Sequence, residues 1–305
     1  MAPAEDDISI DEKRVYAGTA GRTDAYVATG AGIVRVSLSA DKVGAFDMVD
    51  RGPAEDVAVL ARDGAPDVIA AATPDGLSVA PVGDDPAFEP VDDDPAVAVG
   101  SFGVTESGEA RDDGLLVARE GESIERVELD DPTTEESTAS VASTTQIGSV
   151  ADPRAIDDGL VAGADGVFRV THDTVKDVGL ADARDVAGAG MPLAATDAGL
   201  YWLGNGWMSV REETAEAVAA DGDGHAMAVV DGDLLVHDGA AEGEAEAWAA
   251  TALPVDEAAV ALGYGPGVSV AVTAAGTLCV DAGDGWRHQV VGVREVEGVA
   301  LAVVE

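Results

Sequence analysis

The sequence predicts an all-β chain that folds as a β-propeller, and three observations support this prediction. A two-strand hairpin pattern recurs seven times along the 305 residues. The glycines that close the hairpin turns are 44, 45, 45, 33, 33 and 44 residues apart, which is the length of a propeller blade. A shorter apolar segment precedes each hairpin and a more polar segment follows it. Each unit therefore contains four expected strands.

The stretch DAYVATGAGIVRVSL at 24–38 shows the hairpin in full: an apolar run, a tight turn and a second apolar run. Glycine suits such turns because they require positive φ, which other residues adopt only with steric strain. After the turn, Val34 and Val36 alternate with polar residues, so one face of the strand is set towards packing. The seven turn glycines are Gly32, Gly76, Gly121, Gly166, Gly199, Gly232 and Gly276.

Because the repeat runs from end to end, we expect a single propeller domain over residues 1–305. Seven hairpins predict seven blades of four antiparallel strands. The stretch VEGVALAVV at 296–304 is a further copy of a first strand, and it is expected to close the ring. The sequence does not say which blade it completes, so six or eight blades remain alternatives. The expected units are 12–50, 54–92, 95–140, 146–180, 182–214, 215–252 and 255–292.

The charge is the strongest feature of the composition. There are 59 acidic and 17 basic residues, for a net charge of −42, and only Lys13, Lys42 and Lys176 are lysines. In dilute buffer this charge opposes compaction, whereas molar salt screens it over a Debye length of about 3 Å. The composition is typical of acidic, halophilic cytoplasmic proteins. Nucleic acids and anionic membranes are excluded as expected partners because both require a basic surface.

The remaining composition favours a folded intracellular protein. Hydrophobic residues make up 47% of the chain, which excludes an acidic disordered polymer. Cys279 is the single cysteine, so no intramolecular disulfide forms. The acidic start MAPAEDDISIDEKR lacks the pattern of a secretory signal, and no window has the length of apolar residues that a membrane span requires. We therefore expect cytoplasmic localisation and no membrane contact.

No motif for catalysis, phosphate binding or metal binding is present in the sequence. The histidines differ in repeat position, so exposed histidines at strand ends are favoured over a metal site built by the ring. The aspartates of the hairpin turns are explained by turn chemistry. We assign no catalytic residue, no metal ligand and no cofactor. The four histidines are His172, His225, His237 and His288.

One set of residues is a candidate binding site. Arg14, Arg154 and Arg184 each open the expected first strand of a unit, and first strands line the central channel of a propeller. Arginine matches carboxylate and phosphate oxygens, so the three would bind an anionic group at one mouth of the channel. The competing interpretation is that each arginine pairs locally with an aspartate such as Asp152 or Asp185.

The repeat YVATGAGIVRV and its copies resemble the broad YVTN/WD-type propeller superfamily, although the WD and GH pairs of WD40 repeats are absent. With its acidic bias and short alanine-rich blades, the chain is similar to a haloarchaeal family of uncharacterised β-propeller proteins. This resemblance implies the fold and transfers no functional residue, because propellers host many unrelated activities.

Two functions from different classes follow from these observations. The favoured one is a non-enzymatic propeller that binds a protein partner or a small anionic ligand at the channel mouth. The alternative is an enzyme, a hydrolase or a lyase, with its site in the central channel. No acid, base or nucleophile recurs at matched repeat positions, and this disfavours the enzyme.

Overall fold

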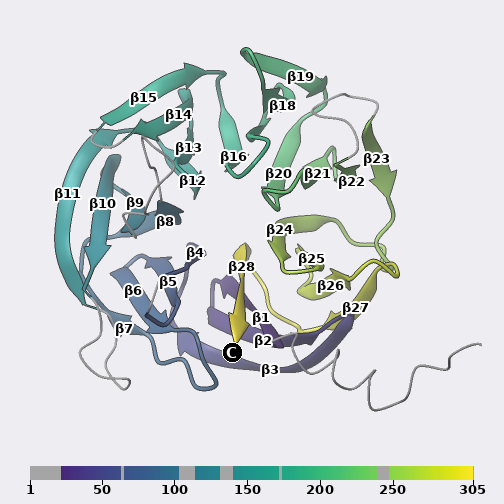
Figure 1. Ribbon diagram of the computed structural model, residues 1–305, viewed down its shortest axis with the longest axis horizontal. Coiled ribbons are helices and arrows are strands. Elements are labelled where there is room, and N and C mark those ends of the chain that lie inside the picture. The colour runs from purple at the N-terminus through teal and green to yellow at the C-terminus, as the bar shows by residue number, and fades with distance from the viewer. Residues whose placement is uncertain are drawn as a thin grey trace, which may run out of the picture.

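The computed structural model describes residues 22–62, 65–102, 114–130, 140–171, 174–239 and 247–304. These residues form seven antiparallel sheets of four strands, arranged as blades around a central axis (Figure 1). The predicted seven-bladed propeller is therefore confirmed. Within the described ranges, no helix has the length and apolar character needed to cross a membrane.

Blades 2 to 7 each consist of four consecutive strands, with the first strand innermost. Blade 2 contains β4 (Asp56–Leu60), β5 (Val68–Thr73), β6 (Gly76–Pro81) and β7 (Glu89–Pro90), and blade 3 contains β8 (Ala96–Phe102), β9 (Gly114–Arg119), β10 (Ser123–Leu129) and β11 (Val141–Ser149). Blade 4 contains β12 (Pro153–Asp157), β13 (Leu160–Gly163), β14 (Gly166–Thr171) and β15 (Thr174–Gly179), and blade 5 contains β16 (Ala183–Ala187), β17 (Leu193–Thr196), β18 (Gly199–Leu203) and β19 (Trp207–Arg211). Blade 6 contains β20 (Ala215–Ala220), β21 (His225–Val230), β22 (Asp233–Asp238) and β23 (Trp248–Thr251), and blade 7 contains β24 (Ala259–Gly265), β25 (Val268–Thr273), β26 (Thr277–Asp281) and β27 (Arg287–Val290).

Blade 1 closes the ring by combining the two ends of the chain. Its order is β28 (Val296–Val304), β1 (Arg22–Thr29), β2 (Gly32–Ser39) and β3 (Lys42–Arg51), so the last strand is the innermost. Antiparallel pairing of β28 with β1 runs from Arg22↔Val304 to Thr29↔Val296. The segment 14–19, which we expected to be the first strand of this blade, lies outside the described residues, and β28 holds the innermost position.

The boundary between blades 3 and 4 differs from the expected one. The fourth strand of blade 3, β11, ends at Ser149, and β12 begins at Pro153, whereas the sequence placed the end of the unit at 140. The acidic stretch near 130–140 had the composition of a connection between units. In the structure, the strands on either side of it, β10 and β11, belong to one blade.

The hairpin turns explain the recurring glycines. Gly32 (φ +142°) and Gly199 (φ +144°) lie in a region that side chains rarely adopt, and a Cβ at either would collide with a backbone oxygen of the neighbouring strand. The turn at Gly121 is different, because Glu122 takes the positive φ (+67°) instead. In the turn of blade 1, the Thr29 hydroxyl donates to the Gly32 carbonyl (2.7 Å) and accepts from the Ala31 N–H (3.2 Å).

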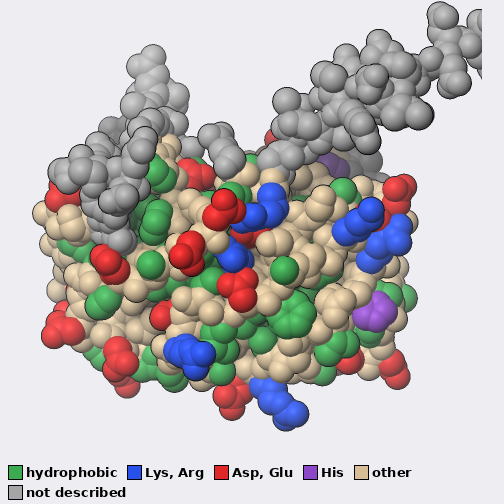
Figure 2. Space-filling view, turned by 90° about the horizontal axis from the view of Figure 1, so that it is seen from below, with side chains coloured by type: hydrophobic (Ala, Val, Ile, Leu, Met, Phe, Trp, Pro, Cys, Tyr) green, Lys and Arg blue, Asp and Glu red, His purple; other side chains and the backbone are tan. Residues whose placement is uncertain are grey.

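The outer strands form the flank of the ring and are mostly exposed. All four residues of β27 are exposed, as are most of β3 and β11. Figure 2 shows one flank, on which acidic side chains and several basic ones are spread among hydrophobic and uncharged ones.

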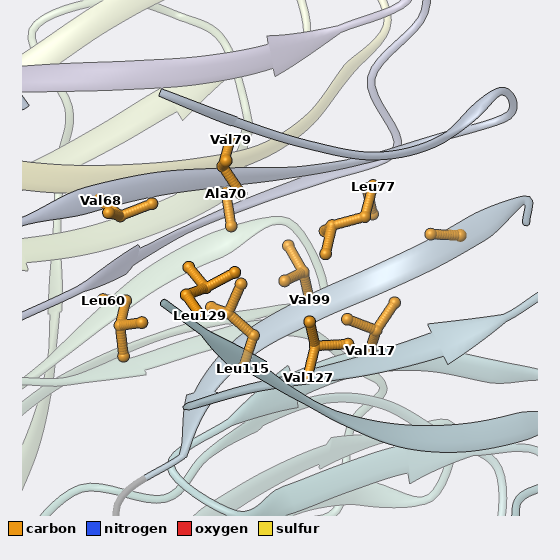
Figure 3. Close-up of a cluster of buried hydrophobic side chains, with 12 residues drawn as sticks. Leu60, Val68, Ala70, Leu77, Val79, Val99, Leu115, Val117, Val127 and Leu129 are labelled. Atoms are coloured by element: carbon orange, nitrogen blue, oxygen red, sulfur yellow. The ribbon is translucent and has the colours of Figure 1, made fainter. Parts of the chain in front are cut away.

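The core consists of seven apolar clusters, one between each pair of neighbouring blades. Between blades 2 and 3, leucines and valines from β4, β5 and β6 face those of β8, β9 and β10 (Figure 3). Many of the buried residues are alanine and valine, which allows the sheets to pack closely. Each blade therefore depends on its two neighbours, and the closure of blade 1 completes two of the seven clusters.

Candidate functional site

The axis of the ring contains a cavity of about 360 Å³, whose wall is formed by the innermost strands of all seven blades. The prediction that first strands line the channel is confirmed for blades 2 to 7. The wall consists of small apolar residues, backbone and a few charged side chains. This cavity is the candidate site.

A repeated β-bulge brings one residue of each inner strand to the same end of the channel. In a bulge, two residues face one on the partner strand, and the extra side chain is redirected. Register shifts place this extra residue at the second position of β8, β12, β16, β20, β24 and β28. In blade 2, Glu55 and Asp56 both face Ala72, which is the same arrangement. Six of these residues line the cavity, and we call them the mouth ring: Glu55, Arg154, Arg184, Glu216, Val260 and Glu297. Val97, at the same position of β8, packs against the apolar cluster between blades 3 and 4.

Arg154 belongs to the mouth ring through β12 and is held in place by its neighbours. Its Nε and Nη2 donate to Asp152 Oδ2 at 3.0 and 2.8 Å. Its Nη1 donates to the carbonyl of Ala183 in the next blade at 3.1 Å. The guanidinium is about one-third exposed and spans the interface between blades 4 and 5.

Arg184 occupies the equivalent position in β16, on the next blade. Its Nε forms an ion pair with Asp197. Among the described residues, its two terminal nitrogens have no hydrogen-bond partner, and the side chain is 44% exposed. The expected local pairing is therefore present at Arg154, which binds Asp152, whereas Arg184 binds Asp197, an aspartate that the sequence analysis did not name.

The structure brings together two of the three arginines that the sequence singled out. Arg14 lies outside the described residues. The inner strand of blade 1 is β28, and its residue in the mouth ring is Glu297. Among the described residues, the mouth ring therefore contains two of the three expected arginines, together with three glutamates and one valine. The order of the strands accounts for Glu297, because β28 holds the innermost position of blade 1.

Two glutamates of the mouth ring, Glu297 and Glu216, have pKa values raised by their environment. Burial raises the pKa of Glu297, and the charges of Glu55 and Glu295 raise it further. Burial also raises the pKa of Glu216, although its bond from the Gly232 N–H and the charge of Arg184 act in the opposite direction. The Oε2 atom of Glu216 is buried without a hydrogen-bond partner among the described residues. The mouth ring is thus crowded with carboxylates on one side.

Deeper in the channel, Asp56, Asp157 and Asp185 link neighbouring inner strands. Asp56 accepts the N–H of Val99 at 3.0 Å, and Asp185 accepts that of Val218 at 2.8 Å. Burial raises the pKa of Asp56 and of Asp185 to about 7 and that of Asp157 to about 6. The sequence analysis considered Asp157 and Asp185 only as possible partners of the arginines and missed this role, although Asp56 and Asp185 occupy one repeat position and are both followed by valine.

The histidines do not contribute to this site. His225 pairs with Asp221 at 2.6 Å, and His288 is exposed on β27. His237 is buried, so the expectation of an exposed strand-end histidine is wrong here. Its Nδ1 lies 3.0 Å from the Gly224 carbonyl, and its ring packs on Trp248. His172 lies outside the described residues. No group of three potential metal ligands occurs in the part of the chain that the structure describes.

Comparison with known families identifies the architecture. A family model described as HVO_0234-like β-propeller matches residues 9–302. The chain belongs to this family. Membership in the HVO_0234-like family agrees with the seven blades and with the expected resemblance to haloarchaeal propellers. No match was found among curated proteins.

Solved structures similar to this HVO_0234-like propeller share its fold. YCF48 bound to a D1 peptide is 15% identical with a TM-score of 0.55, covering 93% of this chain and 97% of that one. Apo AztD from Citrobacter koseri is 11% identical with a TM-score of 0.52, covering 92% and 98%. The WD40 propeller domain of Doa1 is 14% identical with a TM-score of 0.52, covering 80% and 84%. At these identities, the comparisons show the fold alone.

Proposed function

We propose that this protein is a non-enzymatic binding propeller, which docks a segment of a partner protein over the mouth ring. In this proposal, a carboxylate of the segment binds Arg184 and contacts Arg154 on the neighbouring blade. Arg154 and Arg184 are the cationic residues among the described residues that line the cavity, so an anionic group binds at the mouth instead of entering the channel.

The observation that carries the proposal is the state of Arg184. Its Nε is fixed by Asp197, while Nη1 and Nη2 form no hydrogen bond in the described chain, and the nearby Glu216 interacts with Arg184 only through its charge. A guanidinium that is already oriented loses little conformational entropy when it binds a carboxylate, and two parallel hydrogen bonds make the contact strong. Arg154 is likewise oriented by Asp152 and Ala183. The two arginines therefore form a prepared site for one acidic group.

A protein segment is favoured over a small anion for an electrostatic reason. Two arginines face three glutamates in the mouth ring, and Asp152 and Asp197 already pair with the arginines. A free anion would gain little from such a surface. A segment can add backbone hydrogen bonds and apolar contacts, for example with Val260, which is 38% exposed. Peptide binding also has a precedent on this fold, since YCF48 is bound to a D1 peptide.

The enzyme alternative has one observation in its favour. Asp56, Asp157 and Asp185 have pKa values raised towards neutrality, as general acids and bases require. Each of these carboxylates, however, accepts backbone N–H groups of the channel wall. These hydrogen bonds account for the aspartates as links between blades, and the binding proposal is the better supported one.

A displayed library of random short peptides tests the proposed function. Panning uses the lowest KCl concentration at which the circular dichroism spectrum of the protein is the same as in molar KCl. We expect the enriched peptides to share an acidic residue and to lose about tenfold or more in affinity for Arg154→Gln/Arg184→Gln. The control is Arg287→Gln, which removes another exposed, ion-paired arginine from the outer strand β27. Equal binding to wild type and to the double variant would overturn the proposal.

A further inference from the structure

We infer that the segment recognised at the mouth ring carries both signs of charge: an acidic group for Arg154 and Arg184, and a basic side chain for Glu55 and Glu297. This inference rests on the proposed function and specifies the chemistry of its partner. It follows from the order of charged residues around the channel mouth, from the proximity of Glu55 and Glu297 to each other, and from the separation of these glutamates from Arg154 and Arg184.

The order of inner strands places the two charges on opposite sides of the channel. Going around the ring, the strands follow in the sequence β12, β16, β20, β24, β28, β4 and β8 (Figure 1). Arg154 and Arg184 lie on β12 and β16, which are neighbours. In a ring of seven strands, β28, which carries Glu297, lies directly across the channel from this pair. Glu55 directly precedes β4, the strand next to β28. The mouth is therefore positive on one side and negative on the other.

The two sides are separated differently along the two arcs of the ring. Val97 lies between Glu55 and Arg154 in the strand order. Along the other arc, Glu216 lies next to Arg184, whose charge favours the ionised form of Glu216, and Val260 lies between Glu216 and Glu297. Neither arginine is an ion-pair partner of Glu55 or Glu297. The mouth ring therefore does not neutralise itself across the channel, although arginine and glutamate are both present.

The glutamates on the negative side differ from the many exposed carboxylates of this acidic protein. Glu55, Glu295 and Glu297 are close enough for their charges to oppose the ionisation of Glu297, which burial opposes as well. In the described chain, no lysine or arginine forms an ion pair with any of the three. A cationic group bound here would relieve this repulsion, whereas an isolated surface carboxylate gains little from pairing.

The chemistry of the cation follows from the same residues. The described chain holds no group of three side chains suited to a metal ion. A lysine or arginine side chain needs no such group, because its N–H donors bind separate carboxylates. Since both sides belong to one mouth, a single segment with an acidic and a basic side chain spans them. The opposite arrangement, a uniformly acidic segment, would place negative charge against Glu297.

The peptide library separates this inference from the proposed function. We expect enriched peptides to contain a basic residue at a constant spacing from the acidic one. The Glu55→Gln/Glu297→Gln variant should lose the preference for the basic residue and keep the preference for the acidic one. Arg154→Gln/Arg184→Gln should show the reverse. The control is Glu89→Gln, which removes an exposed carboxylate from the outer strand β7.

A measurement on the wild-type protein avoids any effect of substitution on folding. A selected peptide is compared with a version in which norleucine replaces its lysine, and the affinity should fall about tenfold. Enriched peptides that are acidic only, with unchanged binding to Glu55→Gln/Glu297→Gln, would overturn the inference and leave the proposed function intact. Equal binding to wild type and to Arg154→Gln/Arg184→Gln would overturn both.

Discussion

The carboxylate of Asp185 in blade 5 accepts the backbone N–H of Val218 in blade 6, at 2.8 Å, and also that of Val186 in its own strand. Asp56 makes the same pair of hydrogen bonds in blade 2, to Val99 and Val57. Two blade interfaces are thus linked by a side chain at the same repeat position. These links lie in the channel wall, where protein surrounds the carboxylates and their pKa values are raised to about 7.

The first prediction concerns the pH dependence of stability. In the unfolded chain, Asp56 and Asp185 lose their protons near pH 4, whereas in the native state they hold them to about pH 7. The native state therefore binds more protons in this range, and the free energy of unfolding falls as the pH rises from 4 to 7. At about 1.4 kcal/mol per pKa unit, the total is on the order of several kcal/mol.

Urea unfolding at pH 5 and pH 8, in the same molar KCl, measures this effect. The Asp56→Asn/Asp185→Asn variant should show a smaller difference between the two pH values, because only Asp157 of the three channel aspartates still titrates. Asp75→Asn, in an exposed turn, is the control and should keep the wild-type difference. The same pH dependence in the channel variant and in wild type would contradict the prediction.

Arg119 is predicted to be the most costly arginine to remove. It is 5% exposed and binds Asp92 through Nη1 and Nη2, at 3.0 and 2.7 Å, and Glu125 through Nε at 2.8 Å. Arg119→Ala would leave two carboxylates near the interior without a cation. We expect a loss of about 3–5 kcal/mol in the free energy of unfolding, measured by chemical denaturation.

Two further variants sharpen this test. Arg119→Lys keeps the charge but not the planar fork, so it should be destabilised by an intermediate amount. Arg287→Ala removes an exposed pair with Asp41, and it should change stability by only about 0–1 kcal/mol. Similar losses for Arg119→Ala and Arg287→Ala would show that the buried network is not a major source of stability.

Ring closure gives a third prediction. Deleting 296–304 removes the inner strand of blade 1, its pairing with β1 and its apolar contacts with blades 7 and 2. We expect the truncated chain to lose its cooperative urea transition and its near-ultraviolet circular dichroism signal, since each blade needs both neighbours. Deletion of Glu305 alone is the control. A truncated chain with a native-like transition would mean that six complete blades are sufficient.

The salt dependence gives a fourth prediction. The net charge of −42 repels itself over a Debye length of about 10 Å at 0.1 M salt and about 3 Å at 1 M. The melting temperature should therefore rise steadily as KCl is raised from 0.1 M to molar concentrations. Differential scanning fluorimetry measures this dependence. A melting temperature that is the same at both ends of the series would contradict the halophilic interpretation of the composition.

Much of the fold could be predicted from local patterns. The hairpin copies around Gly32 and Gly199, with alternation after each turn, determine strands and turns through contacts between nearby residues. Repetition of this unit predicts blades, and the position of the first strand within a unit predicts the channel wall. The placement of Arg154 and Arg184 at one mouth followed from these local rules.

Only the tertiary structure determined how the channel mouth is composed. The pairing of Arg22 with Val304 joins residues from the two ends of the chain, and no local pattern specifies it. This pairing places Glu297 in the mouth ring. The bulges and the hydrogen bond between Asp185 and Val218 likewise depend on contacts between strands or blades. Local sequence patterns specify the repeating unit because short-range backbone preferences are enough for a hairpin. The charge pattern of the site depends on which distant residues become neighbours, and ring closure alone decides this.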